Sequence, residues 1–198
     1  MITRNLPQAG LKLTKIAVGG AVLLGLGLSA ATMTFAAETK PLPTVDKVNL
    51  GNYLGTWYEV ARKPLQFQNK CDRDVTATYT LNENGNVKVD NRCIKKDGSI
   101  TQSVGEAFAQ NPPYNTQFKV SFLPEAIRWI PIARGDYWIL KLDDNYQTVL
   151  VGEPKRKYMW VLSRTPQPDP AVVSEYLEYA KSVGYDLSDL IQTKQTVR

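Results

Sequence analysis

The 198-residue chain contains no histidine and only two cysteines. Histidine is the usual general base beside a serine or cysteine nucleophile, and it is also the commonest metal ligand. No nucleophile motif occurs, and no group of the remaining candidate ligands has the spacing of a metal site. We therefore expect no catalytic residue, no metal and no cofactor.

Acidic residues are absent from the apolar run 16–31, and the residues before it carry three positive charges. This order of charge and apolar character is typical of a secretory signal. Small residues at 29 and 31 and at 34 and 36 allow cleavage near residue 31 or 36, and we assign residues 1–36 to a signal peptide and residues 37–198 to one domain. Because the stretch 16–37 is roughly long enough to span a bilayer, an uncleaved membrane anchor is the alternative.

No cysteine precedes Cys71, so no thiol is available for lipid attachment near the cleavage site. We therefore expect an exported protein, periplasmic or secreted, without a lipid anchor. Exported proteins meet an oxidising compartment, which favours a single disulfide between Cys71 and Cys93.

Excess positive charge is also lacking once the signal is set aside. The chain has 24 basic and 19 acidic residues, and three of the basic residues lie in the signal, which leaves 21 against 19. A nucleic-acid partner is not expected for such a balanced chain. One basic group, 155–157, fits either a solvated turn or a contact with anionic lipid head groups.

Short apolar or alternating segments, separated by turn sequences such as Asn84-Gly85, predict an all-β domain. Eight antiparallel strands close most simply into an up-and-down barrel, whose interior has room for one small ligand; a filled core or a sandwich is the alternative. One C-terminal helix should follow, with Asp169 as its N-cap, Pro170 at its first position and Gly184 at its exit. The predicted strands are 56–62, 75–81, 86–94, 100–109, 117–122, 136–142, 146–152 and 158–164.

Strand side chains alternate between two faces, so each charged residue assigns its neighbours to one side of the barrel. Lys88, Lys119 and Lys141 should face water, and Ser121 should share that face. The residues then assigned to the interior are Val87, Val89, Asn91, Phe118, Val120, Phe122, Trp138, Leu140 and Leu142, while Trp160 and Leu162 share one face of the last strand.

The segment 123–135 is a longer loop that is rich in apolar residues, including Ile127, Trp129 and Ile132. Exposed apolar patches of this kind mark contact sites. The loop should therefore either fold over the protein or touch a membrane or a partner.

Three segments in this order, "GTWYEVAR", "GDYWIL" and "YMWVLSRTP", resemble the sequence blocks of the lipocalin family, most of all its bacterial outer-membrane and apolipoprotein D-like members. The matching residues are Gly55, Trp57, Asp136, Tyr137 and Arg164. The resemblance implies a structural role for them, with Trp57 at the closed end of the barrel and the Arg164 guanidinium across its ring. Glu59 and Arg62 are then expected at outer or rim positions.

The same resemblance implies a ligand pocket with Tyr79, Asn91 and Trp160 as polar or aromatic contacts, and with apolar walls from Phe118, Phe122 and Trp138. It implies binding or transport of a small hydrophobic ligand, such as a fatty acid or a lysophospholipid, and a role in membrane maintenance under stress. The alternatives are an enzyme that modifies such a ligand, and a module that docks on a membrane or receptor. We expect a monomer or a homodimer.

Overall fold

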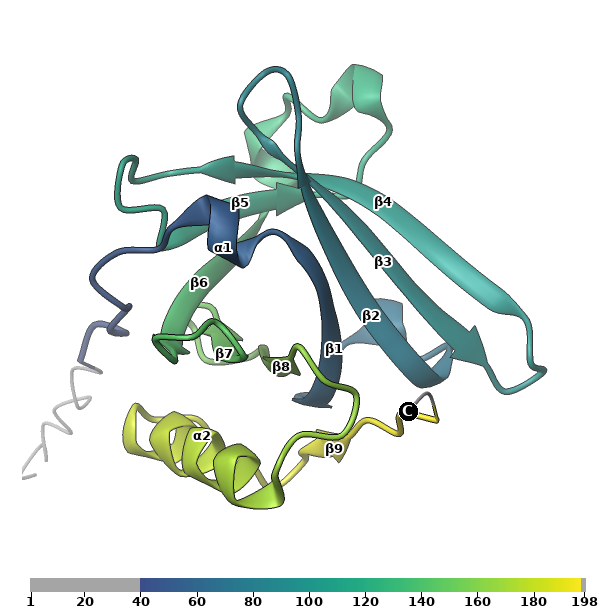
Figure 1. Ribbon diagram of the computed structural model, residues 1–198. Coiled ribbons are helices and arrows are strands. Elements are labelled where there is room, and N and C mark those ends of the chain that lie inside the picture. Colours follow the sequence, from purple (N-terminus) through teal and green to yellow (C-terminus); the bar gives the residue numbers. More distant parts are fainter. Residues whose placement is uncertain (1–39, 197–198) are drawn as a thin grey trace, which may run out of the picture. The chain divides into compact units, whose positions relative to one another are not determined.

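The computed structural model describes residues 40–196, and the predicted signal peptide 1–36 lies outside this range. Eight antiparallel strands form a closed barrel (Figure 1), which confirms the predicted fold. Each strand pairs with the next, and β1 pairs with both β8 and β2. The strands are β1 (Gly55–Arg62), β2 (Cys71–Leu81), β3 (Val87–Lys95), β4 (Ile100–Ala109), β5 (Gln117–Ser121), β6 (Gly135–Leu142), β7 (Thr148–Gly152) and β8 (Met159–Ser163).

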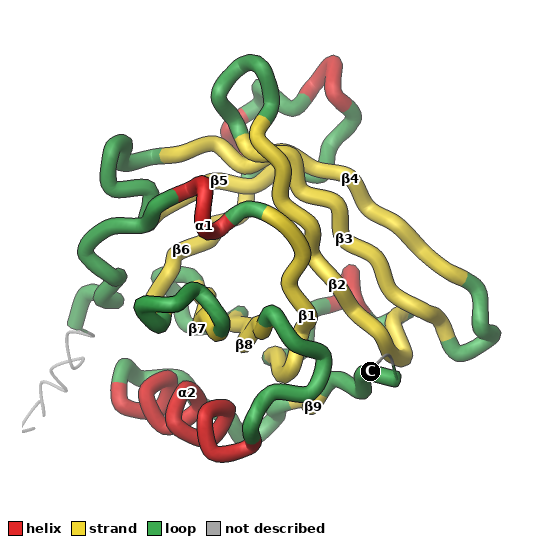
Figure 2. Tube along the Cα trace, viewed as in Figure 1, coloured by secondary structure: helices red, strands yellow, loops and turns green. Residues whose placement is uncertain are grey.

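The helices lie at the edge of this ring of strands and outside it (Figure 2). The predicted helix is α2 (Pro170–Ser182); the Asp169 side chain accepts a hydrogen bond from Ala171 N, and Gly184 has a φ of 95°. A short helix, α1 (Leu50–Tyr53), precedes β1. Within residues 40–196, no helix is both long and apolar enough to cross a membrane. Three single 3-10 turns complete the helical structure described: η1 (Gln66–Gln68), η2 (Glu125–Ile127) and η3 (Pro131–Ala133).

The barrel has two different ends because successive loops alternate between them. We call the first the α1 end: it carries the loops 82–86, 110–116 and 143–147, of which the last two hydrogen-bond to the residues around α1. The second, which we call the far end, carries the loops 63–70, 96–99, 122–134 and 153–158.

A ninth strand, β9 (Ile191–Gln192), was not predicted from the sequence. It pairs with the last residues of β1, and the bridge between Arg73 and Lys194 joins the following residues to β2. Direct pairing of β1 with β2 stops at Tyr58. The C-terminal segment 191–196 therefore fills the gap between these two strands at the far end.

Two apolar clusters, one on each side of the sheet, hold the fold together. The first lies inside the barrel around Trp57, Phe118 and Ile139. The second lies outside, where Leu140, Leu150 and Val161 of the barrel pack against Tyr176 and other residues of α2. The disulfide between Cys71 and Cys93, confirmed in the structure, links the start of β2 to the end of β3.

Glu59 and Arg62 both face inward, against the expected outer or rim position: Glu59 by ordinary alternation from the inward-facing Trp57, and Arg62 through a bulge in β1. Glu59 pairs with Leu162 and Arg62 pairs with Trp160, and both partners pack in the interior cluster. Directly paired residues share a face, so both charged residues face inward. The register shifts between Glu59 and Ala61, and the extra residue of the bulge allows positions three apart to point the same way.

A bulge in β6 likewise makes the predicted parity wrong for Trp138 and Leu140. Both pack in the outer cluster, whereas Tyr137 and Ile139 face the interior. The register shifts between Ile139 and Lys141. Since alternation changes phase at a bulge, Lys141 could not assign the faces of the residues before it.

The segment 122–134 folds outward over β4 and leaves its apolar tip in solvent. Arg128 donates hydrogen bonds to the carbonyl oxygens of Leu123 and Val104, at 2.7 and 3.0 Å. The Arg134 guanidinium lies 3.6 Å from the centroid of the Phe108 ring. Ser121, expected in water, is fully buried, and its hydroxyl accepts a hydrogen bond from Leu123 N.

Candidate functional site

The α1 end of the barrel is closed by Trp57, which is fully buried. The Arg164 guanidinium lies 3.8 Å from the centroid of its ring, and a partly exposed cation–π contact of this kind contributes about 0.5–2 kcal/mol. Arg164 also donates to four backbone carbonyls of residues 52–56, and Trp57 Nε1 donates to Tyr53 O at 2.9 Å. Gly55 has a φ of 95°, and a Cβ there would lie 3.3 Å from Arg164 Nη1. These contacts indicate a structural end plug.

Three tyrosine hydroxyls meet above this plug. Tyr137 Oη lies 2.7 Å from Tyr53 Oη and 3.0 Å from Tyr79 Oη. Burial raises the pKa of Tyr79 to about 12 and raises the pKa of Tyr53 and Tyr137 as well, so all three are protonated at neutral pH. Three hydroxyl protons share two hydrogen bonds, which leaves one O–H without a partner among the described residues.

The two residues of the second sequence block have separate positions. Asp136 lies on the outer face, where its carboxylate forms an ion pair with Lys119 Nζ at 2.7 Å. Tyr137 lies inside, at the centre of the tyrosine group. The resemblance placed both in one structural motif and did not indicate that Tyr137 belongs to the interior.

The aromatic wall of the interior includes Phe118 and Phe122 from β5 and the residue that follows it. Phe118 is buried, whereas Phe122 is 47% exposed. The register of β4 and β5 continues to Phe122 opposite Gly105, and a Cβ at Gly105 would lie 2.7 Å from the Phe122 ring. Gly105 shares the inner face with Val89. Phe122 therefore faces inward, and its exposure places the ring at the far-end rim of the barrel wall.

Asn91 and Trp160 also face the interior, whereas Trp138 does not. Asn91 is half-buried on β3, and its Oδ1 is buried without a hydrogen-bond partner among residues 40–196. Trp160 is half-buried and packs against the interior cluster. Trp138 pairs with Gly152 on the outer face, beside α2. It therefore leaves the set of candidate ligand contacts.

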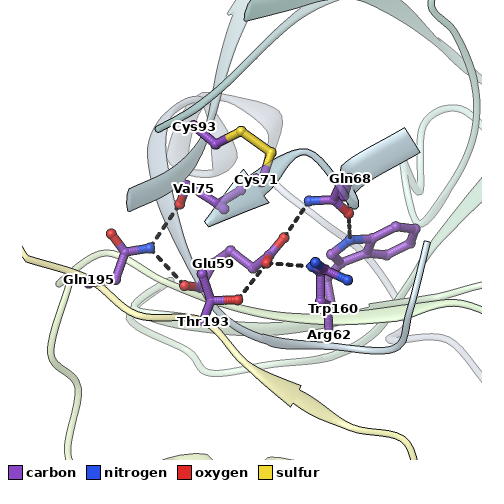
Figure 3. Close-up of a disulfide and its surroundings, with 9 residues drawn as sticks. All are labelled: Glu59, Arg62, Gln68, Cys71, Val75, Cys93, Trp160, Thr193 and Gln195. Atoms are coloured by element: carbon purple, nitrogen blue, oxygen red, sulfur yellow. Dashed lines mark hydrogen bonds and ion pairs between the residues drawn. A yellow bond between two sulfur atoms is a disulfide. The ribbon is translucent and has the colours of Figure 1, made fainter. Parts of the chain in front are cut away.

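A polar group gathers around the buried carboxylate of Glu59 at the far end (Figure 3). Gln68 Nε2 donates to Glu59 Oε2 at 2.8 Å, and Thr193 Oγ1 donates to Glu59 Oε1 at 2.5 Å. Trp160 Nε1 in turn donates to Gln68 Oε1 at 3.0 Å. Arg62 Nε lies 3.1 Å from Glu59 Oε1. Loop 63–70, β8 and the C-terminal segment therefore all contribute to one interior group.

Burial raises the pKa of the Glu59 carboxyl, and the hydrogen bonds from Thr193 and Gln68 and the charge of Arg62 oppose this shift only in part. Gln195 Nε2 adds a bridge between Glu59 O and Val75 O. Among residues 40–196, no group of three or more acidic or cysteine side chains is arranged to hold a metal ion. The site offers hydrogen bonds and one ion pair inside an aromatic wall.

A sequence model described as a lipocalin-like domain matches residues 48–195. The chain belongs to the lipocalin family. Temperature-induced lipocalin-1 of Arabidopsis thaliana is 39% identical over 163 residues, which cover 80% of this chain and 86% of that protein. The outer membrane lipoprotein Blc of Escherichia coli (strain K12) is 35% identical over 176 residues, which cover 85% of this chain and 95% of that protein. Apolipoprotein D of Mus musculus is 31% identical over 183 residues, covering 88% and 92%.

Solved structures of other lipocalins share the fold. The cockroach allergen Per a 4 superimposes with a TM-score of 0.59 at 18% identity, over 78% of this chain and 92% of the allergen. Insecticyanin from the tobacco hornworm Manduca sexta gives a TM-score of 0.59 at 19% identity, over 78% and 84%. Lipocalins bind small hydrophobic ligands and are in general binding or transport proteins.

The contribution of four residues to the interior was not predicted from the sequence: Glu59, Arg62, Gln68 and Thr193. Two charged residues in "YEVAR" within an otherwise apolar strand were the available signal, since buried charges are rare unless they are paired. Gln68 and Thr193 carry no such signal, because only the folded loop and the C-terminal segment bring them to Glu59.

Proposed function

We propose that this lipocalin is an exported carrier that binds a lipid with one acyl chain, or a similar apolar molecule, inside its barrel. The observation that supports the proposal is the inward-facing Phe122, which is 47% exposed above the buried Phe118, because it extends the aromatic wall of the interior to the rim at the far end. Each buried methylene contributes about 0.8 kcal/mol, so a long acyl chain supplies enough free energy for binding without special contacts.

Five of the predicted ligand contacts face inward and are the proposed contacts: Tyr79, Asn91, Phe118, Phe122 and Trp160. Phe118, Phe122 and Trp160 supply the wall. Asn91 Oδ1 is an acceptor without a partner, and the tyrosine group that ends at Tyr79 retains one free O–H, so the interior offers one acceptor and one donor to polar atoms of a ligand. An exported carrier also fits the names of two relatives, an outer membrane lipoprotein and an apolipoprotein.

The test is native mass spectrometry of the protein purified from its own host, followed by extraction and identification of bound molecules. We expect one intact lipid per chain. An empty protein that also fails to bind the neutral fluorophore 1-aminoanthracene would contradict the carrier proposal. A chemically modified product would favour the enzymatic alternative.

We further propose that the far end docks on a bilayer with anionic head groups. Two of its loops place apolar side chains in solvent: Phe67 is 82% exposed on loop 63–70, and on loop 122–134 Trp129 is 70% exposed and Ile132 is 93% exposed. Lys155 and Lys157 are exposed on the fourth loop. Apolar side chains beside positive charges are the features that bind anionic membrane surfaces.

Trp129→Ala should weaken co-sedimentation with vesicles of phosphatidylglycerol and phosphatidylcholine, because an exposed indole inserts at the head-group level. Affinity for 1-aminoanthracene in solution should stay nearly unchanged. Tyr114→Ala, at the α1 end and 56% exposed, is the matched control. Equal losses of vesicle and fluorophore binding in Trp129→Ala would contradict a separate docking surface.

A further inference from the structure

The Arg62 side chain is a buried guanidinium on the inner face of the barrel. The residue is 5% exposed and pairs with the inward-facing Trp160 at the far end. Figure 3 shows Arg62, Gln68 and Trp160 close together beside the Glu59 carboxylate. A molecule that enters the interior from the far end passes this group before it reaches Phe118 and the tyrosines.

Most of the hydrogen-bonding capacity of Arg62 is unused. A guanidinium has five N–H donors. Nη1 donates to Lys63 O at 3.4 Å, which is long for a hydrogen bond. Nε lies 3.1 Å from Glu59 Oε1, in the ion pair with that carboxylate. Nη2 has no protein partner among the described residues, and it is not one of the fully buried atoms without a partner, so its donors are open to an acceptor supplied from outside the chain.

The Glu59 carboxylate does not fill this role because other residues already hold it. Gln68 donates to one of its oxygens and Thr193 to the other. Trp160 fixes the Gln68 amide, and Thr193 is held by β-type pairing, with its N–H donating to Val60 O at 2.8 Å. The carboxylate therefore balances the charge of Arg62 at Nε and makes no contact with the Nη donors.

We propose that Arg62 binds the anionic head group, a carboxylate or a phosphate, of the single-chain lipid in the barrel. This inference rests on the proposed carrier function and adds a ligand class to it. The planar fork of a guanidinium matches two oxygens of either group. The acyl chain would then lie along Trp160, Phe122 and Phe118 towards the tyrosines.

A second negative charge beside Glu59 requires compensation. The titratable or charged groups that face Glu59 are Arg62 on its own strand and Tyr79 on β2; its other polar neighbours, Gln68 and Thr193, are neutral. Burial already raises the pKa of Glu59, so the carboxyl can take up a proton when an anion arrives. The protonated acid still accepts a hydrogen bond, and the Arg62 charge is then balanced by the ligand.

The test compares matched charged and neutral ligands by displacement of 1-aminoanthracene from the full mature protein. One pair is palmitoleate and palmitoleyl alcohol; the other is palmitoyl lysophosphatidate and monopalmitoylglycerol. We expect the charged member of at least one pair to bind about tenfold more tightly or better, as a charge-assisted contact supplies. Preference in the first pair identifies a carboxylate, and preference in the second identifies a phosphate.

The double variant Glu59→Gln/Arg62→Met removes both charges together, so no single buried charge remains. It should lose the head-group preference, so that the charged and neutral members of each pair bind within about twofold of each other. Arg92→Gln, on the outer face of β3, is the control for net charge and should keep the preference.

Equal affinity of the wild-type protein for charged and neutral members of both pairs would overturn the inference, and so would a preference that persists in the double variant. Failure of 1-aminoanthracene to bind at all would instead count against the carrier function. The two proposals are therefore separable in one set of titrations.

Discussion

Arg164 and Arg62, which lie at opposite ends of the barrel, differ in how their hydrogen bonds are used. Arg164 at the α1 end donates to five backbone carbonyls and covers the Trp57 ring. Arg62 at the far end is buried and has one long hydrogen bond. A cation whose donors all have protein partners stabilises the fold, whereas one with unused donors is free to bind a ligand.

The same contrast extends to neutral groups. At the α1 end, the indole N–H of Trp57 has a backbone partner. Towards the far end, Asn91 Oδ1 is buried without one. The comparison indicates that stability resides mainly at the α1 end and ligand recognition at the far end. The predictions below test this division, beginning with the largest effect.

Trp57→Ala should lower the free energy of unfolding by about 3–5 kcal/mol, because it empties a fully buried site and removes the cation–π contact. Urea denaturation followed by circular dichroism measures the change. Trp129→Ala, an exposed tryptophan at the far end, is the matched control and should shift stability by no more than about 0.5 kcal/mol. Similar losses of stability in both variants would contradict the conclusion that stability resides mainly at the α1 end.

Replacing both cysteines with serine should cost about 3 kcal/mol, since the disulfide joins positions 22 residues apart in sequence and constrains the unfolded chain. Thermal unfolding with and without a reducing agent measures the effect. The wild-type protein should lose stability on reduction, and the double serine variant should not respond. The disulfide lies at the far end. A loss of this size would therefore show that the far end also contributes to stability, and the division of roles between the two ends would be less sharp.

Within the tyrosine group, the central hydroxyl should matter more than a terminal one. Tyr137→Phe removes the hydroxyl to which both Tyr53 and Tyr79 are hydrogen-bonded. It leaves both buried hydroxyls without this partner and should lower the free energy of unfolding by about 1–3 kcal/mol. Tyr79→Phe removes a single hydrogen bond and should cost about 1 kcal/mol. Denaturation curves of the two variants give the order directly, and the reverse order would contradict the arrangement described.

Glu59→Gln should change how stability depends on pH. The folded-state pKa of Glu59 lies above its ordinary value of 4.5 because of burial, so the folded protein binds this proton more tightly than the unfolded chain does. The resulting stabilisation is fully present below pH 4.5 and is lost as pH rises through the folded-state pKa. The unfolding free energy of the wild type minus that of the variant should therefore rise as pH falls from neutral towards that value.

Denaturation at several pH values measures this difference, in which the other titrating groups cancel. The same substitution at the exposed Glu125 controls for a general effect of removing one charge. A difference that decreases on acidification would contradict the raised pKa.

Much of the architecture was accessible from the sequence because it depends on local chemistry. Turn residues such as Asn84-Gly85 and the cap Asp169 define where strands and the helix begin or end, and alternation correctly assigned the faces of regular strands such as β3. The disulfide followed from the count of cysteines in a chain with a predicted export signal. The turns, the cap and the alternation depend only on residues that are close together in the sequence.

The interior charges and the position of Trp138 were decided by the tertiary structure. A bulge changes the phase of a strand without a clear signal in the residues around it, which reversed the expected faces of Arg62 in β1 and of Trp138 in β6. Thr193 reaches Glu59 only because the C-terminal segment fills the gap between β1 and β2. Such contacts span more than 130 residues and depend on strand pairing, so the sequence determined the barrel while the closed fold determined what lies inside it.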